Sequence, residues 1–249
     1  MNAAPASPRV VAVIPARLAS TRLPRKVLRE VAGQPLLHWV YAAAKACPQF
    51  AEVIIAVDSD EVAALGRECG WPIVMTSPDL PSGTDRLHAV AQQIDADIYV
   101  NVQGDEPMLT PAHIEAILAP FALPHVEVTT LKVPCPEEDI TNPNVVKVTT
   151  AVDGRALYFS RATIPYHRDP QTPAATRCYK HLGLYAYRRH ALERFASLTP
   201  SPLEMTERLE QLRLLENNLS LYVAEAPFDT VGVDTEEDLA RVDAILRQR

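Results

Sequence analysis

Four cationic residues follow the first apolar run of the chain. That run spans residues 10–14, and its valines and isoleucines show no polar alternation, a pattern typical of a parallel strand buried on both faces. The cations that follow it are Arg17, Arg22, Arg25 and Lys26. Ligands of open parallel sheets bind at the carboxyl ends of the strands, so we expect this basic loop, residues 17–26, to bind phosphate. The alternative is a solvated loop without a ligand.

Two aspartates that are far apart in the sequence also follow apolar runs. Asp105 comes after residues 98–102 and directly after Gly104, which lets the backbone turn closely. Asp234 ends a short apolar run ahead of the last helix. A carboxylate opposite bound phosphate needs a cation between them, and Mg²⁺ binds one or two carboxylates together with phosphate oxygens and water. The two aspartates therefore predict a magnesium site, with an acidic turn at Asp105 and a helix cap at Asp234 as the alternatives.

Several familiar motifs are missing from the chain. No glycine occurs between Pro15 and Gly33, so neither G-x-G-x-x-G nor G-x-x-x-x-G-K-[ST] can be written there. This excludes a dinucleotide-dependent dehydrogenase of the usual kind and a P-loop ATPase. The four cysteines form no C-x-x-C pair and the seven histidines form no H-E-x-x-H cluster. We therefore expect reduced thiols and no zinc site.

The elements that must position these residues alternate between strand and helix in the first half of the chain. Strands are predicted over residues 10–14, 53–57, 73–75 and 98–102. Helices are predicted over residues 35–46, 58–69, 83–94 and 110–118, and residues such as Thr110 and Pro111 mark their starts. This alternation predicts an α/β fold with three layers and a mostly parallel sheet.

The pattern changes after about residue 126. Stretches rich in β-forming residues over 126–133, 145–150 and 156–159, separated by turn residues, predict an inserted antiparallel β extension. Residues 168–176 predict a long exposed loop. Helices are expected near 190–196 and over 203–217, a strand over 220–224, and a last helix from Thr235, where Asp238 completes a capping-box-like start. Without a repeat or a clear linker, we expect one domain over residues 1–249.

Composition limits the classes of partner. The 249 residues include 24 Lys and Arg against 31 Asp and Glu, for a net charge of −7. An acidic chain argues against nonspecific nucleic-acid binding, which requires a basic face. No apolar run approaches the roughly 18–20 residues of a membrane span, and Pro15 and Arg17 interrupt the first run too early for a signal peptide. We therefore expect a cytoplasmic protein with no nucleic-acid or membrane partner.

Five motifs, in this order, resemble those of the sugar-activating nucleotidyltransferases. They are P-A-R-x-x-S-x-R-L-P-x-K (residues 15–26), S-G-T-D-R (82–86), N-V-Q-G-D-E-P (101–107), Y-K-H-L-G (179–183) and G-V-D-T (232–235). As a set they are similar to the 3-deoxy-manno-octulosonate (Kdo) cytidylyltransferases, also called CMP-Kdo synthetases. The resemblance extends from about residue 10 to about residue 246. One residue departs from it, because Arg25 stands where the family usually has glycine.

The resemblance implies a Rossmann-like nucleotidyltransferase fold and a cytidylyltransferase that converts CTP and Kdo to CMP-Kdo and pyrophosphate, for lipopolysaccharide synthesis. It implies Mg²⁺ as the cofactor, and we assign activation of the sugar hydroxyl to the metal because no side chain stands out as a general base. It also implies a homodimer, which we place at residues 126–187, where strands would otherwise expose their edges. The implied site residues are Arg17, Lys26 and Asp105 for catalysis; Arg17, Ser20, Lys26, Ser82, Gly83 and Arg86 for the nucleotide; Gln103, Arg161, His181, Tyr185, Glu210 and Gln211 for the sugar; and Asp105 and Asp234 for the metal.

Both the roles and the activity have alternatives. Ser82 and Gly83 also fit a plain helix-entry turn, Arg161 a surface arginine, His181 a structural histidine, and Glu210 and Gln211 a solvated helix face. The sugar could instead be sialic acid or an amino-Kdo analogue. Two alternatives come from other classes of protein. A metal-dependent glycosyltransferase is disfavoured because no compact D-x-D pair sits at Asp105. A noncatalytic nucleotide-binding regulator is disfavoured by the two candidate metal carboxylates and Lys26.

Overall fold

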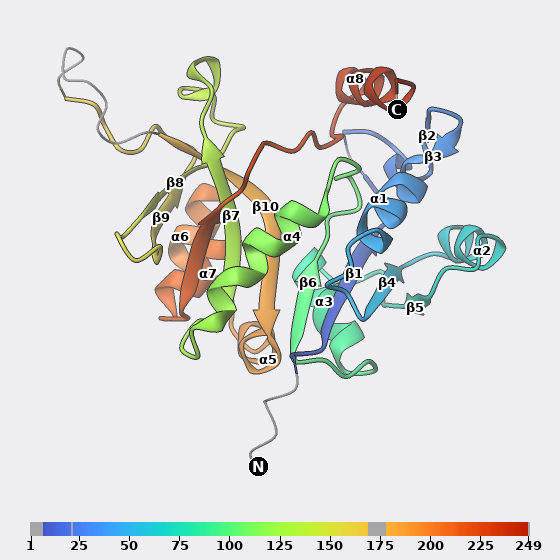
Figure 1. Ribbon diagram of the computed structural model, residues 1–249, viewed down its shortest axis with the longest axis horizontal. Coiled ribbons are helices and arrows are strands. Elements are labelled where there is room, and N and C mark those ends of the chain that lie inside the picture. Colours follow the sequence, from blue (N-terminus) through green and yellow to red (C-terminus); the bar gives the residue numbers. More distant parts are fainter. Residues whose placement is uncertain (1–6, 21, 169–177, 249) are drawn as a thin grey trace. The chain divides into compact units, whose positions relative to one another are not determined.

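Residues 7–20, 22–168 and 178–248 are described by a computed structural model, shown in Figure 1. Contacts divide the chain into two compact units. The first unit comprises Met1–Ile114 and Thr230–Arg249, and the second comprises Glu115–Asp229. The predicted exposed loop over residues 168–176 lies outside the described residues except for residue 168.

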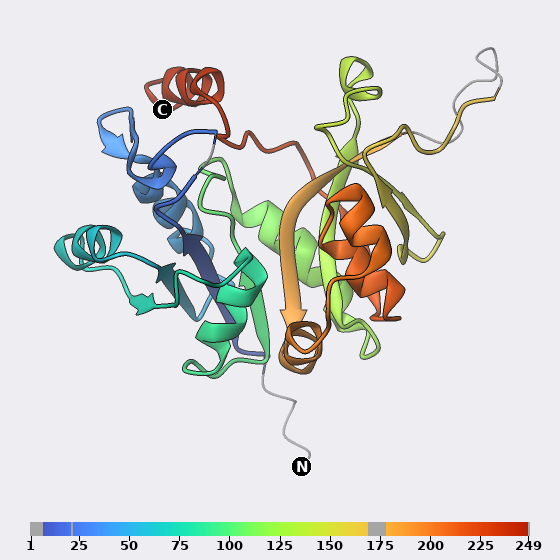
Figure 2. The same ribbon diagram turned by 180° about the vertical axis from the view of Figure 1, so that it is seen from behind.

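A parallel sheet lies at the centre of the first unit. Its strands are β1 (Val10–Ala16), β4 (Glu52–Val57), β5 (Ile73–Met75) and β6 (Ile98–Asn101), in the order β5-β4-β1-β6. Every residue of β1 is buried, as its apolar run predicts. The helices α1 (Leu36–Lys45), α2 (Asp60–Glu68) and α3 (Gly83–Ala91) connect successive strands. Right-handed crossovers put α1 and α2 on one face and α3 on the other, which confirms the three-layer α/β arrangement (Figures 1 and 2).

The direction in which the chain adds strands to this sheet reverses beside β1. From β1 the chain proceeds outward to β4 and β5, and it then returns through α3 to β6 on the other side of β1. Ligands of open α/β sheets bind outside the carboxyl ends of the strands at such a reversal. The loops that begin there are the basic loop, after β1, and the segment that contains Asp105, after β6.

The C-terminal segment belongs to the first unit. α8 (Glu236–Leu246) contacts β2 (Glu30–Val31), which pairs with β3 (Gln34–Pro35) in a short hairpin. Thr235 and Asp238 form the capping box that the sequence predicts. Leu23 of the basic loop and Val233 lie in the same apolar cluster as the buried face of α8. This packing brings the segment that carries Asp234 to the basic loop.

The second unit contains the predicted antiparallel extension. β7 (Val128–Pro134) pairs antiparallel with β10 (Tyr179–Arg188) and parallel with β11 (Leu221–Glu225). β8 (Lys147–Thr150) pairs antiparallel with β10 and with β9 (Ala156–Ser160). β10 is not predicted from the sequence, because Lys180, His181 and Gly183 lower its β-propensity, although Leu182, Leu184 and Ala186 alternate along it and are buried. Pairing with β7 and β8 stabilises this strand where its own sequence pattern is weak.

The helices of the second unit require one correction. α4 (Pro111–Leu118) leads from the first unit into the second, and α5 (Arg189–Ala196) follows β10. The single helix predicted over residues 203–217 is wrong, because the chain forms α6 (Pro202–Glu207) and α7 (Gln211–Glu216). Arg208 adopts a left-handed conformation, with φ 56° and ψ 46°, which ends α6. The described residues also form three short 3₁₀ helices, η1 (Lys26–Leu28), η2 (Ala119–Ala122) and η3 (Glu137–Asp139).

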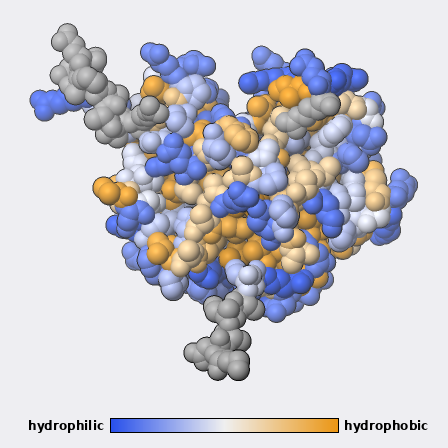
Figure 3. Space-filling view, in the orientation of Figure 1, coloured by the Kyte–Doolittle hydropathy of each residue, from blue (hydrophilic) through white to orange (hydrophobic). Residues whose placement is uncertain are grey.

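The surface is mixed in character. Hydrophilic and apolar residues are interspersed over the face shown in Figure 3. Large apolar side chains that are exposed in the second unit include Val152, Leu157 and Tyr166. Within the part of the chain that the structure describes, no helix has both the length and the apolar character needed to span a membrane.

Candidate active site

A pocket of about 370 Å³ lies in the first unit, at the carboxyl ends of β1 and β6. The residues that line it are Pro15, Arg17, Ala19, Ser20, Arg22, Lys26, Val27, Gly83, Gln103, Gly104, Asp105 and Asp234. The structure therefore brings together the predicted site residues Arg17, Ser20, Lys26, Gly83, Gln103, Asp105 and Asp234. Ser82 and Arg86 are absent from the described lining of this pocket.

The ammonium group of Lys26 lies between the two predicted metal ligands. Its Nζ is 2.5 Å from Asp105 Oδ2 and 2.9 Å from Asp234 Oδ1. Burial lowers the pKa of Lys26, but the two carboxylates outweigh that effect and raise the pKa above its ordinary value. Arg22, to which the sequence analysis gave no separate role, pairs with Asp234 Oδ2 at 2.9 Å. The two carboxylates therefore face the same point, and a cation is stable there.

Backbone contacts bring the aspartates together. The Val233 N–H donates to the Asp105 carbonyl oxygen at 2.9 Å, which places Asp234 beside Asp105. A Cβ atom at Gly104 would lie only 2.7 Å from the Pro15 carbonyl oxygen. Glycine is therefore required at this position, as the sequence predicts, because the backbone after β6 passes very close to the end of β1.

The donor set fits magnesium in one specific way. Among the described residues, no group of three or more His, Cys, Asp or Glu side chains is arranged to hold a metal ion. Asp105 and Asp234 together offer two carboxylates, both of which pair with Lys26. Mg²⁺ commonly takes one or two carboxylates and completes its octahedron with water and substrate phosphates. These residues therefore suit a magnesium ion that arrives together with a phosphate ligand.

Arg25 occupies the position where the family resemblance leads us to expect glycine. Its φ of 58° and ψ of 31° lie in the left-handed region that glycine adopts without steric cost. The guanidinium group pairs with Glu61 of α2. The loop thus keeps a glycine-like backbone at this residue although the side chain is large.

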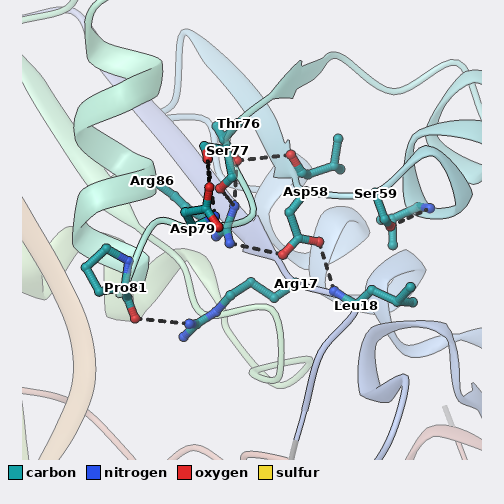
Figure 4. A network of polar contacts seen from close by, with 11 residues as sticks. Arg17, Leu18, Asp58, Ser59, Thr76, Ser77, Asp79, Pro81 and Arg86 are labelled. Carbon is teal, nitrogen blue, oxygen red and sulfur yellow. Dashed lines mark hydrogen bonds and ion pairs between the residues drawn. The ribbon is translucent and has the colours of Figure 1, made fainter.

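Ser82 and Arg17 contact the segment that leads into α3. The Ser82 hydroxyl accepts from the Asp85 N–H and donates to Asp85 Oδ2 at 2.7 Å, so Ser82 is the N-cap of α3. This is the helix-entry role that the sequence left open for Ser82. Arg17 Nη1 donates to the Pro81 carbonyl oxygen at 3.2 Å, as Figure 4 shows.

Arg86 is fully buried in a polar network (Figure 4). Its Nη1 donates to Thr76 Oγ1 at 2.7 Å and to the Ser77 carbonyl oxygen at 3.0 Å. Its Nη2 forms an ion pair with Asp58 Oδ2 at 3.0 Å. This role of Asp58 was not predicted from the sequence, which only places Asp58 at the start of the helix expected over residues 58–69, and Ser59 is the N-cap of that helix. The sequence did offer a signal for this role, because Asp58 directly follows a predicted buried strand and so lies at the same sheet edge as the basic loop.

In the second unit, His181 is a neutral histidine. Its Nε2 lies 2.9 Å from Thr130 Oγ1, and that hydroxyl also lies near the carbonyl oxygens of Leu182 and Leu184. Carbonyls only accept, so the Thr130 hydroxyl donates to one of them, and the His181 Nε2–H donates to Thr130. Burial lowers the pKa of His181 to about 3, which keeps the imidazole uncharged near neutral pH.

Three further predicted sugar-binding residues belong to the second unit. The ring of Tyr185 lies 5.4 Å from that of His181. Burial raises the pKa of Tyr185 well above its ordinary value, and the nearby charges of Tyr187 and Glu210 add to this effect. Glu210 and Gln211 lie at the start of α7, not in the middle of a helix, and Gln211 is buried. The solvated helix face that the sequence allowed is therefore wrong for Gln211.

Arg161 is engaged by main-chain oxygens. Its Nε donates to the Glu207 carbonyl at 2.7 Å, its Nη1 to the Pro143 carbonyl at 3.0 Å, and its Nη2 to the Arg208 carbonyl at 3.4 Å. The Glu207 carboxylate accepts in return from the Arg161 N–H at 2.9 Å. Arg161 thus ties the end of β9 to the end of α6. Binding a sugar carboxylate would require it to exchange some of these partners.

Comparisons with known proteins identify the family. A family model described as cytidylyltransferase matches residues 11–222. A 3-deoxy-manno-octulosonate cytidylyltransferase from Acidobacterium capsulatum is 65% identical over 240 residues, which cover 96% of this chain and 97% of that protein. The chain belongs to the 3-deoxy-manno-octulosonate cytidylyltransferase family. Its membership confirms the resemblance that the five motifs indicate and the assignment as a nucleotidyltransferase.

Further members and folds agree with this assignment. The 3-deoxy-manno-octulosonate cytidylyltransferase of Koribacter versatilis is 55% identical and covers 97% of this chain and 91% of its own length. The structure of a CMP:2-keto-3-deoxy-manno-octonic acid synthetase complexed with CTP is 40% identical, with a TM-score of 0.91 over 96% of this chain and 99% of that one. An inositol-1-phosphate CTP transferase from T. maritima, 13% identical with a TM-score of 0.67 over 95% of each chain, shares the fold alone. The predicted α/β nucleotidyltransferase fold is thereby confirmed.

Proposed function

We propose that this chain transfers the cytidylyl group of CTP to Kdo, giving CMP-Kdo and pyrophosphate. The observation that carries the proposal is the pocket in which three basic side chains face two convergent carboxylates. Relatives that bear the name of this activity match almost the whole chain, at 65% and 55% identity. We place the product in lipopolysaccharide synthesis, as the motif resemblance implies.

The basic side chains of the pocket suit a triphosphate. Arg17, Arg22 and Lys26 line it together with Ser20 and the first residue of α3. Charge-assisted contacts with arginine and lysine hold several phosphate charges at once, which glycine-rich loops achieve in other folds with main-chain N–H groups. We assign Ser20 and Gly83 to contacts with the same nucleotide.

The reaction is an in-line displacement at the α-phosphorus, in which the anomeric hydroxyl attacks and pyrophosphate leaves. We assign Mg²⁺ to Asp105 and Asp234, where it would lower the pKa of that hydroxyl and brace phosphate oxygens. Arg17 and Lys26 neutralise the charge that grows on the departing pyrophosphate. Removing either cation should therefore lower the rate more than it weakens the binding of ground-state CTP.

We assign sugar recognition to polar residues that the resemblance indicates. They are Gln103, Arg161, His181, Tyr185, Glu210 and Gln211. His181 retains an unprotonated Nδ1, because its Nε2–H is committed to Thr130. It thus offers an acceptor to a sugar hydroxyl. A site that hydrogen-bonds several hydroxyls rejects analogues that leave its polar groups unpaired.

Replacing His181 with alanine tests the sugar assignment. We expect kcat/KM for Kdo to fall by about 1–3 kcal/mol of transition-state stabilisation, the cost of one unmet polar contact. The dissociation constant for CTP, measured by calorimetry, should stay nearly unchanged. His190→Ala is a matched control, because His190 is exposed. Weakened CTP binding with normal Kdo kinetics would contradict the assignment.

A pyrophosphate-release assay tests the whole function. The assay compares CTP, UTP and ATP, each with Kdo, N-acetylneuraminate and an amino-Kdo analogue. We expect rapid release from CTP with Kdo and a large preference in kcat/KM over N-acetylneuraminate. Equal turnover of another acid sugar would favour the related cytidylyltransferases. No release with any pair would favour the noncatalytic regulator.

We also propose a cytoplasmic homodimer formed through residues 126–187. β9 forms a ladder with β8 alone among the described strands, and Leu157 of β9 and Val152 in the turn before it are exposed. Unpaired strand edges of this kind are commonly covered by a partner. The free cysteines suit a reducing compartment. Light scattering is expected to give a dimer mass at micromolar concentration, and a monomer mass there would remove the proposal.

A further inference from the structure

A buried ion pair lies beneath the start of the basic loop. The side chain of Arg86 is 0% exposed and that of Asp58 is 8% exposed, with Nη2 and Oδ2 3.0 Å apart. A charge taken out of water is retained only where a partner and hydrogen bonds compensate it. The guanidinium has such partners in Asp58, Thr76 and Ser77. These contacts hold the pair in one position, as Figure 4 shows.

The second oxygen of the Asp58 carboxylate contacts the basic loop itself. Asp58 Oδ1 accepts from the Leu18 N–H at 3.0 Å. Leu18 follows Arg17 directly, so this hydrogen bond fixes the main chain on the carboxyl side of Arg17. The Arg17 side chain reaches the Pro81 carbonyl, in the segment that Arg86 secures through Ser77. One carboxylate thus joins the segments that follow β1, β4 and β5.

We propose that Asp58 is a positioning residue for the nucleotide, which acts through Leu18 and Arg86 to hold Arg17 ready for the phosphates. This inference rests on the proposed CTP site. A loop that is already ordered loses less conformational freedom when its ligand binds, so the anchor strengthens CTP binding without touching CTP. Arg86, which the resemblance assigns to the nucleotide, acts here through the same network and from a buried position.

The substitution Asp58→Asn tests the anchor with little change in shape. Leu18 and Arg86 donate to different oxygens of Asp58, and in the variant one of those two positions carries an NH₂ group, which cannot accept a hydrogen bond. We expect the dissociation constant for CTP, measured by calorimetry, to rise about 10- to 100-fold, as for small misplacements of binding groups. The KM for CTP should rise in parallel, and kcat at saturating CTP should fall as well, because a misplaced Arg17 also neutralises less of the charge on the departing pyrophosphate.

Glu204→Gln provides a matched control for loss of stability alone. Glu204 pairs with Arg213 at 2.5 Å, and both side chains are largely buried, 13% and 11% exposed, in the second unit. This variant also leaves a buried arginine without its carboxylate. We expect its melting temperature to fall as that of Asp58→Asn does, with no change in CTP affinity. An equal loss of CTP affinity in both variants would overturn the positioning role.

A double variant keeps the test decisive if Asp58→Asn does not fold. Asp58→Leu combined with Arg86→Met removes both charges, and apolar replacements of a buried pair are often tolerated. We expect a folded protein with the same loss of CTP affinity, because the Leu18 N–H has lost its acceptor. Wild-type affinity for CTP in this variant would overturn the inference. Failure of the wild-type protein itself to bind CTP would instead contradict the proposed function.

Discussion

Asp105→Asn is expected to lower kcat by about 100-fold or more, as loss of charge stabilisation at a reacting phosphate does in comparable sites. Asparagine keeps the size of the side chain but supplies no negative charge to a divalent cation. The same result is expected for Asp234→Asn, because the two carboxylates face one point next to Lys26 Nζ. The measurement is kcat at saturating CTP, Kdo and Mg²⁺.

The fold is expected to survive both substitutions. The side chains of Asp105 and Asp234 are 27% and 45% exposed, so no fully buried charge is left unpaired. Glu236→Gln is a suitable control, because this exposed acid lies two residues after Asp234 and pairs with Arg29 outside the pocket. Its kcat should match the wild-type value. An aspartate variant that retained wild-type kcat at saturating magnesium would remove that residue from the metal site.

Lys26→Ala is expected to lower kcat about 100-fold and to weaken CTP binding much less. The negative charge on the leaving pyrophosphate grows toward the transition state, so a cation at this position stabilises the transition state more than the bound substrate. Steady-state kinetics at saturating substrate give kcat, and calorimetry gives the dissociation constant for CTP. Lys26→Arg is the control that keeps the charge, and it should retain more activity than the alanine variant. A change confined to the KM for CTP would mean that Lys26 only anchors the ground-state nucleotide.

The site in the first unit could be predicted from the sequence because one rule connects distant residues. Buried parallel strands end at a common edge, so cations after β1 and an acid after β6 had to lie close together. Asp234 was expected at the end of an apolar run, but no strand forms there, and the packing of Val233 with Leu23 and α8 brings Asp234 to the site instead. The capping box at Thr235 fixed where the last helix begins. The glycine requirement at Gly104 was also readable, since an acid after a strand-end glycine marks a tight turn.

What the sequence did not reveal depends on tertiary pairing. β10 contains Lys180, His181 and Gly183, which have low β-propensity, and it becomes a strand because β7 and β8 pair with it. The helix predicted over residues 203–217 has no glycine or internal proline to mark its break. It is divided by the left-handed Arg208, a conformation that local propensity does not favour in arginine. The hydrogen bonds of Asp58 with Leu18 and Arg86 join three segments, and no local sequence pattern in these segments predicts them.

The position of Lys26 between Asp105 and Asp234 has a consequence for the order in which ligands associate. The protein carries its own counter-ion at this point, so a triphosphate that draws the ammonium group away leaves two facing carboxylates in need of a divalent cation. A cation at the carboxylates would, in turn, release the lysine toward the phosphates. Linkage makes these two effects equal in free energy, so nucleotide and metal would bind cooperatively, with a single side chain as the link between them.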